Sequence, residues 1–402
     1  MRAAGSGRKR PPLRHDCTSR CLVHIEVITD HSRFLALGSV WNKLLERSGI
    51  DHPFLTHEWI SIWWDCFAES ATPYILTVMS GADIIAIAPL MINRARLYGC
   101  PIRRLQAIVN VYTERFDLLL GDRPQEVCEL MWAYLKDHAD QWDVLELRQL
   151  PGNSQTLTHL PGLIERDGYR VGRWSANEAP YVAIRQPWET YYQSLKKAHR
   201  SNVRNHTRQL ERHGPVTLDI VAIDDRWEAD MEDALKLEAV SWKVDEGTSL
   251  RSRQESALFY RRMLQRAAQL GWLHMCFLKV GPVRIAVRIS LLYRNKLFML
   301  KSGYNETYHR YSPGQVLTEC LLREAWVKKW DEVDFLGEDE RWKLSWATDR
   351  RPHSWLFVFP NRVKSRLLHG MKFRVIPSIR QSNLFPTVRR TMLKFGVPIH
   401  GD

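Results

Sequence analysis

Two hairpin-like segments that lie 200 residues apart limit the possible folds of this chain more than any other feature. The first hairpin joins residues 75–78 to 84–92 through a turn at 80–83, and the second joins 273–280 to 283–292 around Gly281-Pro282. Both follow a pair of expected helices and precede a further strand and helix, so the sequence indicates an internal duplication. The matching positions are Gly81, Ile85, Ala86 and Ile87 in the first hairpin and Gly281, Ile285, Ala286 and Val287 in the second.

The order of the expected elements predicts a mixed α/β fold. Each half reads as a strand, two helices, a meander of strands, a helix and a strand. A chain of 402 residues also exceeds what one hydrophobic core usually organises, so we expect about two domains. The predicted organisation is a disordered basic N-terminus over residues 1–20, domains over 21–179 and 180–360, and a basic C-terminal tail over 361–402.

The net charge of +13 is concentrated at the two ends of the chain. Residues 1–20 and 361–402 carry all of it, and residues 21–360 sum to zero. A protein that reads DNA more often carries its positive charge on the folded surface, so DNA is not an expected partner. The basic ends are either solvated segments or make a weak contact with an anionic membrane surface.

Cysteine usage and hydropathy favour a cytoplasmic protein. The longest apolar run, residues 84–92, is far shorter than the roughly 20 residues that span a bilayer. No apolar segment follows the basic residues at the start, so we expect no secretory signal. Seven cysteines without a CxxC pair argue against a disulfide framework and against a zinc site, and no metal is expected. We expect the cytoplasm, with peripheral contact at the inner face of the membrane as a further possibility.

Residues 301–315 are the best candidate for the chemistry of this chain. An expected strand at 297–301 precedes them and an expected helix at 316–329 follows. Ser312 suits the N-cap position, Pro313 the first helical position, and Gly314 leaves the opening turn free of side-chain bulk. Unpaired backbone N–H groups at such a helix start can hold a phosphate or pyrophosphate group. An ordinary helix start is the alternative.

A second candidate segment, residues 337–346, directly follows an expected strand at 332–336. It contains three carboxylates, a lysine and two tryptophans, and open α/β sheets bind ligands beyond the carboxyl ends of their strands. A carboxylate there could take the proton of an amine nucleophile. A solvated acidic turn is the alternative.

An expected helix over residues 195–213 carries a basic residue at every fourth position. Such a stripe is either a solvated helix face or a surface that binds phosphates, for example those of a tRNA. The residues are Lys196, Arg200, Arg204, Arg208 and Arg212.

Several of these motifs together resemble the bacterial CelD-type acetyltransferase domain of the GNAT superfamily. They are residues 237–243, residues 303–308 with 311–314, and residues 334–337 with Trp342, Lys343 and Trp346. The likeness covers residues 180–350 and, more loosely, 23–150. It implies two GNAT-like (acyl-CoA N-acyltransferase) domains in tandem, as in the FemABX peptidyltransferases, with acetyl-CoA or another acyl-CoA as donor.

The resemblance also implies roles for individual residues. The pyrophosphate loop would comprise Arg310, Tyr311, Ser312, Pro313, Gly314 and Gln315. Asp339 would act as catalytic base with Glu338 in reserve, and Lys343 would orient an acidic substrate or the attacked carbonyl. The acceptor site would include Trp242, Lys243, Tyr304 and Trp346. The family's loop usually has two glycines after its Gln or Arg, whereas here only Gly314 follows Arg310.

The resulting hypothesis is an acyltransferase. It would move an acetyl or other acyl group from acyl-CoA to an amine, or a hydroxyl, of an envelope or polysaccharide-related acceptor, which could be a small molecule or a glycan or peptide precursor. The first half would be structural or form part of the acceptor cleft. One alternative is transfer of an amino acid from aminoacyl-tRNA, with the basic helix on the RNA. Another is a non-catalytic GNAT pair that serves as a scaffold for exopolysaccharide synthesis.

Overall fold

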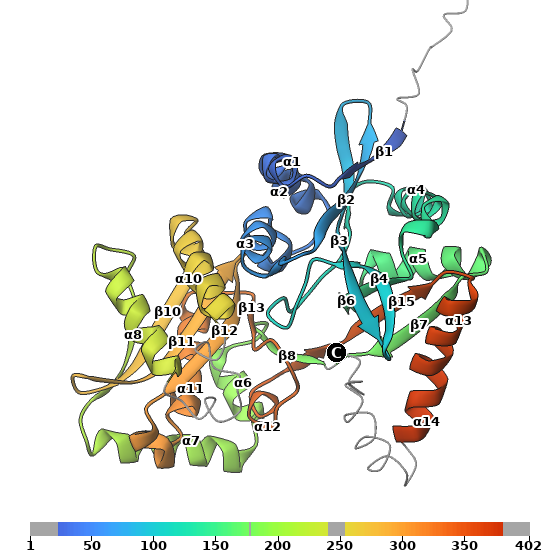
Figure 1. Ribbon diagram of the computed structural model, residues 1–402. Coiled ribbons are helices and arrows are strands. Elements are labelled where there is room, and N and C mark those ends of the chain that lie inside the picture. Colours follow the sequence, from blue (N-terminus) through green and yellow to red (C-terminus); the bar gives the residue numbers. More distant parts are fainter. Residues whose placement is uncertain (1–22, 177, 240–253, 381–402) are drawn as a thin grey trace, which may run out of the picture.

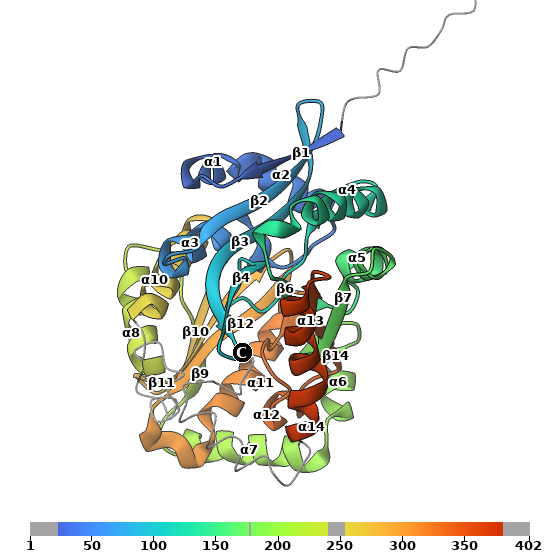
Figure 2. The same cartoon turned by 45° about the vertical axis from the view of Figure 1, so that its right-hand side comes forward.

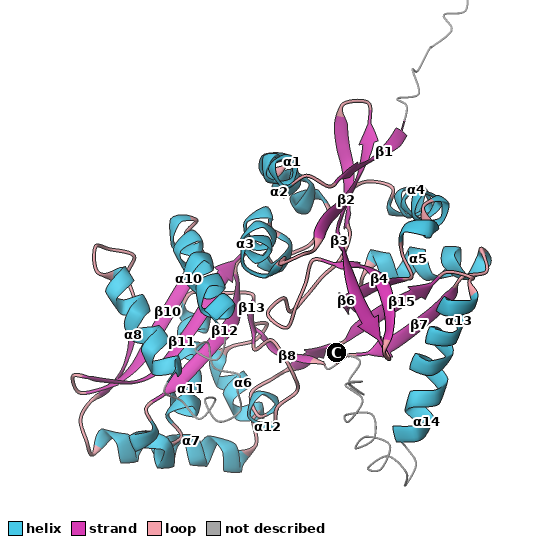
Figure 3. Ribbon diagram, viewed as in Figure 1, coloured by secondary structure: helices cyan, strands magenta, loops and turns pink. Residues whose placement is uncertain are grey.

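The computed structural model describes residues 23–176, 178–239 and 254–380, and these residues form two β-sheets with helices packed against them (Figures 1 and 3). The first sheet has eight strands in the order β1-β2-β3-β4-β6-β15-β7, with β5 paired to β3. Its strands are β1 (Val23–Ile28), β2 (Thr72–Ser80), β3 (Asp83–Leu97), β4 (Cys100–Ala107), β5 (Leu119–Leu120), β6 (Val144–Pro151), β7 (Arg170–Ser175) and β15 (His353–Phe359).

The second sheet has seven strands in the order β14-β8-β13-β12-β11-β10-β9. Its strands are β8 (Ala179–Ala183), β9 (Val216–Ile220), β10 (Leu273–Val280), β11 (Val283–Tyr293), β12 (Lys296–Tyr304), β13 (Glu332–Asp334) and β14 (Asp349–Arg351). The pairing of β12 with β13 is parallel and the other pairings of this sheet are antiparallel.

Helices of the first half pack around the first sheet, and those of the second half cover both faces of the second sheet. The first group comprises α1 (His31–Ala36), α2 (Gly38–Arg47), α3 (His57–Phe67), α4 (Pro124–Asp137) and α5 (Gln155–Arg166). The second comprises α6 (Trp188–Ser194), α7 (Lys197–Glu211), α8 (Trp227–Ala239), α10 (Gln254–Gln269), α11 (Pro313–Val327) and α12 (Arg341–Leu344). The chain then forms α13 (Val363–Gly370), a π-helical turn (Met371–Val375) and α14 (Ile376–Arg380). No helix of the described residues is long and apolar enough to cross a bilayer.

The two predicted hairpins have the same irregularity at matching positions, which supports the predicted duplication. The register shifts between Val78 and Met79 in β2 and between Leu278 and Lys279 in β10, again 200 residues apart. Gly81 and Gly281 both adopt positive φ in the turns, at 63° and 55°. Each half therefore repeats a bulged hairpin that leads into a third strand.

One strand lies in a different sheet from the one that chain order suggests. Although β15 follows the strands of the second sheet in sequence, it lies between β6 and β7 of the first sheet. In turn β8, which follows β7, lies between β13 and β14 of the second sheet. Four consecutive β15 residues, from Leu356 to Phe359, are buried, so both faces of this strand are covered.

The predicted second domain over residues 180–360 therefore differs from the structure in β15, which belongs to the first sheet. The second sheet begins with β8, close to the predicted boundary at residue 179. The predicted tail over 361–402 also differs from the structure, because α13 and the π-helical turn that follows it pack against the first sheet (Figure 2). The ring of Phe373 lies 5.5 Å from that of Trp174 and 5.7 Å from that of Phe357. Residues 1–22 and 381–402, which carry the other predicted basic and disordered segments, lie outside the described residues.

A shared hydrophobic core joins the two halves. One cluster of buried side chains contains residues of both α3 and α10, and the rings of Trp59 and Phe259 lie 5.2 Å apart at a near-perpendicular angle. Phe54 of the first half similarly contacts Phe298 of β12. Polar groups cross the same interface, where the buried guanidinium of Arg115 pairs with the fully buried carboxylate of Asp334. The halves therefore pack as one body, and the first half reaches the end of β13.

Candidate active site

The second sheet opens between β12 and β13. The two strands lie side by side over three residue pairs, from Lys296–Glu332 to Phe298–Asp334. Beyond these pairs β12 continues to Tyr304, while the segment that follows β13 turns away at Leu336 and Gly337, which have φ of 55° and 59°. Among the described residues, no strand pairs with this edge of β12 beyond Phe298. An extended ligand can approach this edge of β12 as an added strand does.

A β-bulge distorts β12 at the start of this open edge. Ile289 of β11 lies opposite Lys301, and Ser290 lies opposite Met299, so Leu300 is an extra residue in β12. A bulge of this kind bends the strand and re-aims its groups, and such bulges are common beside active sites. The distortion lies where the two strands separate.

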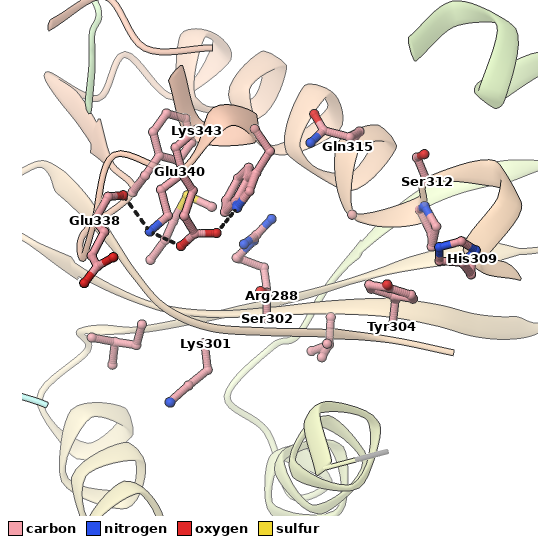
Figure 4. A pocket seen from close by; sticks show the side chains of 18 residues that line it. Arg288, Lys301, Ser302, Tyr304, His309, Ser312, Gln315, Glu338, Glu340 and Lys343 are labelled. Atoms are coloured by element: carbon pink, nitrogen blue, oxygen red, sulfur yellow. Dashed lines mark hydrogen bonds and ion pairs between the residues drawn. The ribbon is translucent and has the colours of Figure 1, made fainter. Parts of the chain in front are cut away.

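A cavity of about 780 Å³ occupies the opening (Figure 4). Its walls come from β11, β12, the start of α11 and the segment 335–343. The structure thereby brings together residues from both candidate segments of the sequence. The predicted site residues that line it are Tyr304, Ser312, Pro313, Gly314, Gln315, Glu338 and Lys343.

Helix α11 begins where the sequence predicts, but its first turn offers fewer free amides than expected. Ser312 precedes the helix with φ 46° and ψ 55°, and because an N-cap needs an extended backbone, its side chain makes no capping hydrogen bond. The Ser312 N–H donates to the carbonyl of His309 (2.9 Å), and the Gln315 N–H donates to the carbonyl of Ser312 (2.9 Å). Pro313 has no N–H. In the described structure this leaves the Gly314 N–H as the one backbone donor of residues 312–315 without a partner.

Four of the predicted site residues do not line the cavity. The Tyr311 side chain is buried, and its hydroxyl contacts Nε2 of His213 (2.9 Å). The exposed Arg310 donates to the same hydroxyl (2.6 Å) and lies over the ring of Tyr311. Trp346 is fully buried in the core and donates its indole N–H to Oε1 of Gln315 (2.7 Å). Asp339 is exposed and lies outside the cavity lining.

Trp242 and Lys243, the other two residues predicted for the acceptor site, lie outside the described residues. Their predicted contact with the acceptor therefore stays a prediction.

Lys343 is a structural residue of the cavity wall. The side chain is buried, and its ammonium donates to the carbonyls of Leu336 (2.9 Å) and Glu338 (3.2 Å). It also pairs with the carboxylate of Glu340 at 2.8 Å. These contacts occupy all three of its N–H groups, so Lys343 holds the 336–340 turn in place. The prediction that it orients a substrate does not agree with this arrangement.

Arg288 lines the cavity and was missed in the sequence. It lies in the middle of β11, is 4% exposed, and donates from Nη2 to the hydroxyl of Thr318 in α11 (3.0 Å). Its Nε is buried without a hydrogen-bond partner, and no carboxylate of the described residues lies within 4 Å of the guanidinium. Burial lowers the pKa of Arg288 to about 10. A single arginine inside the apolar run of residues 285–292 was the available signal.

The first half contributes to the opposite side of the opening. Lys301 points from β12 away from Arg288 (Figure 4), and its ammonium lies 5.5 Å from the ring centre of Tyr112 and 5.2 Å from that of Tyr260. Burial lowers the pKa of Lys301, against the opposing effect of the carboxylates of Glu238 and Glu114. Burial likewise raises the pKa of Glu114, which accepts a hydrogen bond from the Gly337 N–H (3.0 Å).

The corresponding opening of the first sheet is filled by its own chain. Strands β4 and β6 pair in parallel over residues 104–106 and 144–146, as β12 and β13 do. The following segment crosses the gap, where the Phe116 N–H donates to the carbonyl of Gln149 (3.0 Å). Helix α4 nevertheless begins as α11 does, with a positive-φ residue, Arg123, ahead of a proline. The duplicated half thus retains the helix start, but residues 108–118 cover the open edge.

Comparisons with known proteins relate the second half to a family. Residues 197–344 match the sequence model of a family described as an acetyltransferase (GNAT) domain. No curated protein matches the chain in sequence. Among solved structures, FemX is similar with a TM-score of 0.52 and 10% identity, and the match covers 86% of this chain and 99% of FemX. A conserved protein of unknown function from Bacteroides thetaiotaomicron gives a TM-score of 0.50 and 12% identity over 84% of this chain and 100% of its own. These likenesses confirm the predicted mixed α/β fold with two sheets.

Proposed function

Residues 197–344 form an acetyltransferase domain of the GNAT family, and on that premise we propose that the chain transfers an acyl group from an acyl-CoA to an amine or hydroxyl acceptor. The observation that carries the proposal is the open edge of β12 beside the start of α11. In the reaction, the nucleophile attacks the thioester carbonyl, the CoA thiolate leaves, and a base takes the nucleophile's proton. An envelope or polysaccharide-related acceptor remains the preferred class, because the motifs of residues 237–346 resemble the CelD-type domain.

The donor site follows from the two walls of the cavity. The edge of β12 beyond Phe298, with which no strand of the described residues pairs, would bind the extended arm of the donor as an added strand is bound. The Gly314 N–H, at the positive end of the α11 dipole, would donate to a phosphate oxygen. Because a Cβ at Gly314 meets no atom within 4 Å, the space beside this residue is open. One free amide is a weaker anchor than the six-residue loop predicted from the sequence.

The acceptor would approach from the side of Lys301 and Glu114. Glu338 is exposed, lines the cavity and lies on the turn that Lys343 holds, so it is our choice for the base. Asp339, the first choice from the sequence, does not line the cavity in which the reacting groups would meet.

Calorimetric titration with acetyl-CoA tests the donor site. We compare the wild type with Gly314→Trp, which would fill the cavity beside the first turn of α11. A matched control is Gly162→Trp, because Gly162 is also an exposed helical glycine whose Cβ would meet no atom within 4 Å, and it lies in α5. We expect the first variant to lose at least about tenfold in affinity and the control to bind as the wild type does. Equal binding by all three proteins would remove the α11 start from the mechanism.

Helix α7 supports a second candidate function, transfer of an amino acid from aminoacyl-tRNA. Arg204, Arg208 and Arg212 are exposed on this helix, as a phosphate-binding surface requires. In this case tRNA would bind in a strongly salt-dependent way, and Arg204→Gln with Arg208→Gln would reduce both the affinity and the salt slope. Binding of tRNA that does not respond to salt or to these changes would exclude the helix as an RNA surface.

A further inference from the structure

We propose that Arg288 binds an anionic group of the ligand, a carboxylate or a phosphate, inside the cavity between β12 and α11. The identity of the ligand as an acyl-CoA rests on the proposed function, whereas the need for an anion follows from the surroundings of Arg288 itself.

The guanidinium of Arg288 is a buried charge that pairs with no carboxylate of the described residues. Its hydrogen bond to Thr318 engages a neutral hydroxyl, and its Nε has no partner. The nearest carboxylate of the cavity wall, on Glu340, already accepts from the indole N–H of Trp342 (2.6 Å) and pairs with Lys343. A buried cation normally pairs with a carboxylate or another anion, because removing it from water is costly. We therefore expect the ligand to supply the counterion of Arg288.

The arrangement of the strand aims this charge at the cavity. Side chains of β11 alternate between the two faces of the sheet, so Val287 and Ile289 pack in the α8 and α10 core while Arg288 faces α11. The guanidinium stands over the opening in Figure 4, with the ring of Trp342 5.5 Å from its Cζ. A planar cation against an aromatic ring keeps its N–H fork free for a planar or tetrahedral anion.

The hydrogen bonds of Thr318 connect Arg288 to the first turn of α11, where the Gly314 amide lies. Its hydroxyl accepts from Arg288 and donates to the carbonyl of Gly314 (2.7 Å), one helical turn earlier. The Gly314 amide and Arg288 therefore line the same α11 wall of one cavity. Two sources of the anion fit this wall: a phosphate of the donor nucleotide, or a carboxylate at the far end of the acyl group. The second source would make the enzyme selective for a dicarboxylic acyl group.

The test uses Arg288→Met, which removes the charge and nearly preserves the side-chain length, with Arg94→Met as control because Arg94 is an exposed strand arginine of β3. Calorimetry with acetyl-CoA and succinyl-CoA measures the ligand, and thermal unfolding in pyrophosphate or succinate measures the anion site alone. Losing a charged hydrogen bond should weaken binding about 10- to 100-fold. Loss confined to succinyl-CoA identifies the acyl carboxylate, and equal loss for both thioesters identifies a phosphate.

Each other outcome is also decisive. Affinities and anion-induced stabilisation that are the same in the wild type and Arg288→Met would overturn the inference while leaving the donor proposal intact. If no thioester binds the wild type but pyrophosphate or succinate stabilises it through Arg288, the donor proposal fails and the anion site stands. Should Arg288→Met not fold, Arg288→Lys retains the charge and is expected to keep the anion-induced stabilisation. Failure of both variants to fold would assign Arg288 to the core alone and overturn the inference.

Discussion

At the scale of single residues, burial determines the protonation of His274 in β10. The imidazole is 8% exposed, its Nδ1 is buried without a partner, and its ring meets Trp330 edge-on at 5.1 Å. Burial lowers the pKa of His274 to about 4 from its ordinary value of 6.5. The folded protein therefore takes up this proton at a lower pH than the unfolded chain does.

The pH dependence of stability follows from that difference. As pH falls from about 6.5 to 4, the unfolded chain binds the proton first, so the free energy of unfolding decreases. Between pH 7.5 and pH 5 the wild type should lose about 2 kcal/mol more than His274→Phe, as measured by urea unfolding at both values. Identical pH dependence in the wild type and His274→Phe would contradict the assignment.

Two adjacent carboxylates of the 337–346 segment, one in the cavity wall and one outside it, allow the choice of catalytic base to be tested. Glu338 lines the cavity and Asp339 does not. We expect Glu338→Gln to lower the rate of acyl-CoA-dependent acyl transfer to an amine by about 100-fold with unchanged acyl-CoA affinity. Asp339→Asn is the matched control and should stay within about twofold of the wild type. The reverse result would restore Asp339 as the base.

Individual positions show where sequence reasoning succeeds and where it stops. The sequence placed Ser312, Pro313 and Gly314 correctly at the start of α11, because their backbone preferences are local. It could not show that Ser312 adopts a left-handed conformation, which commits the neighbouring amides to turn hydrogen bonds. The sequence predicts Trp346 as a pocket residue, but its side chain is buried against α7 and α11. No local sequence pattern shows how these helices pack, so this burial could not be predicted.

At the scale of elements, α13 and α14 belong to the folded body. Lys372 is 2% exposed, with its ammonium 3.9 Å from the ring centre of Trp174, and a Cβ on Gly172 would lie 2.1 Å from the Phe373 ring. The helical segment thus seals β7 and β15 at a site where only glycine leaves enough room for the aromatic ring.

Deletion of residues 361–402 should therefore unfold or strongly destabilise the protein, since it exposes Trp174 and Phe357. Deletion of residues 381–402 should leave the melting temperature within a few degrees of the wild type. Thermal unfolding of both truncated chains checks this, and equal melting temperatures would contradict the packing role of α13. The shorter deletion is also the proper one for testing the proposed membrane contact by flotation with anionic liposomes.

Element prediction worked best for hairpins and worst for strand partners. Local alternation and Gly81 or Gly281 in the turns were enough to find both hairpins. Nothing in residues 353–359 indicates that this strand pairs with β6 and β7, because an apolar run fits any buried position in a sheet.

At the scale of the whole molecule, an ion-pair network fixes the first half against the open end of β13. Arg115 pairs with Asp334, which also accepts from Arg351 at 2.7 Å, and Arg351 in turn holds Glu332 at 3.0 Å. Burial raises the pKa of Asp334, but the two guanidinium groups outweigh this effect and the net shift is downward. The carboxylate is therefore charged in the folded protein at neutral pH.

Breaking this network should be costly. Arg115→Met leaves Asp334 buried with one guanidinium partner, and we expect a loss of about 3 to 5 kcal/mol in the free energy of unfolding by urea titration. Arg33→Met removes an exposed partner of Glu26 and should cost at most about 1 kcal/mol. If the two variants lost similar stability, the network would not join the halves.

No pattern in the sequence indicates this contact, because Arg115 and Asp334 lie 219 residues apart.

The position of β15 also affects how the protein is made on the ribosome. When β7 has been synthesised, its one neighbour in the first sheet is still about 180 residues from being translated, which corresponds to on the order of 10 to 40 s at ordinary elongation rates. Until then β6 exposes an unpaired apolar edge and β7 has no partner. The nascent N-terminal half thus remains unfinished, and open to chaperones or to pairing with another chain, until nearly the whole polypeptide has emerged.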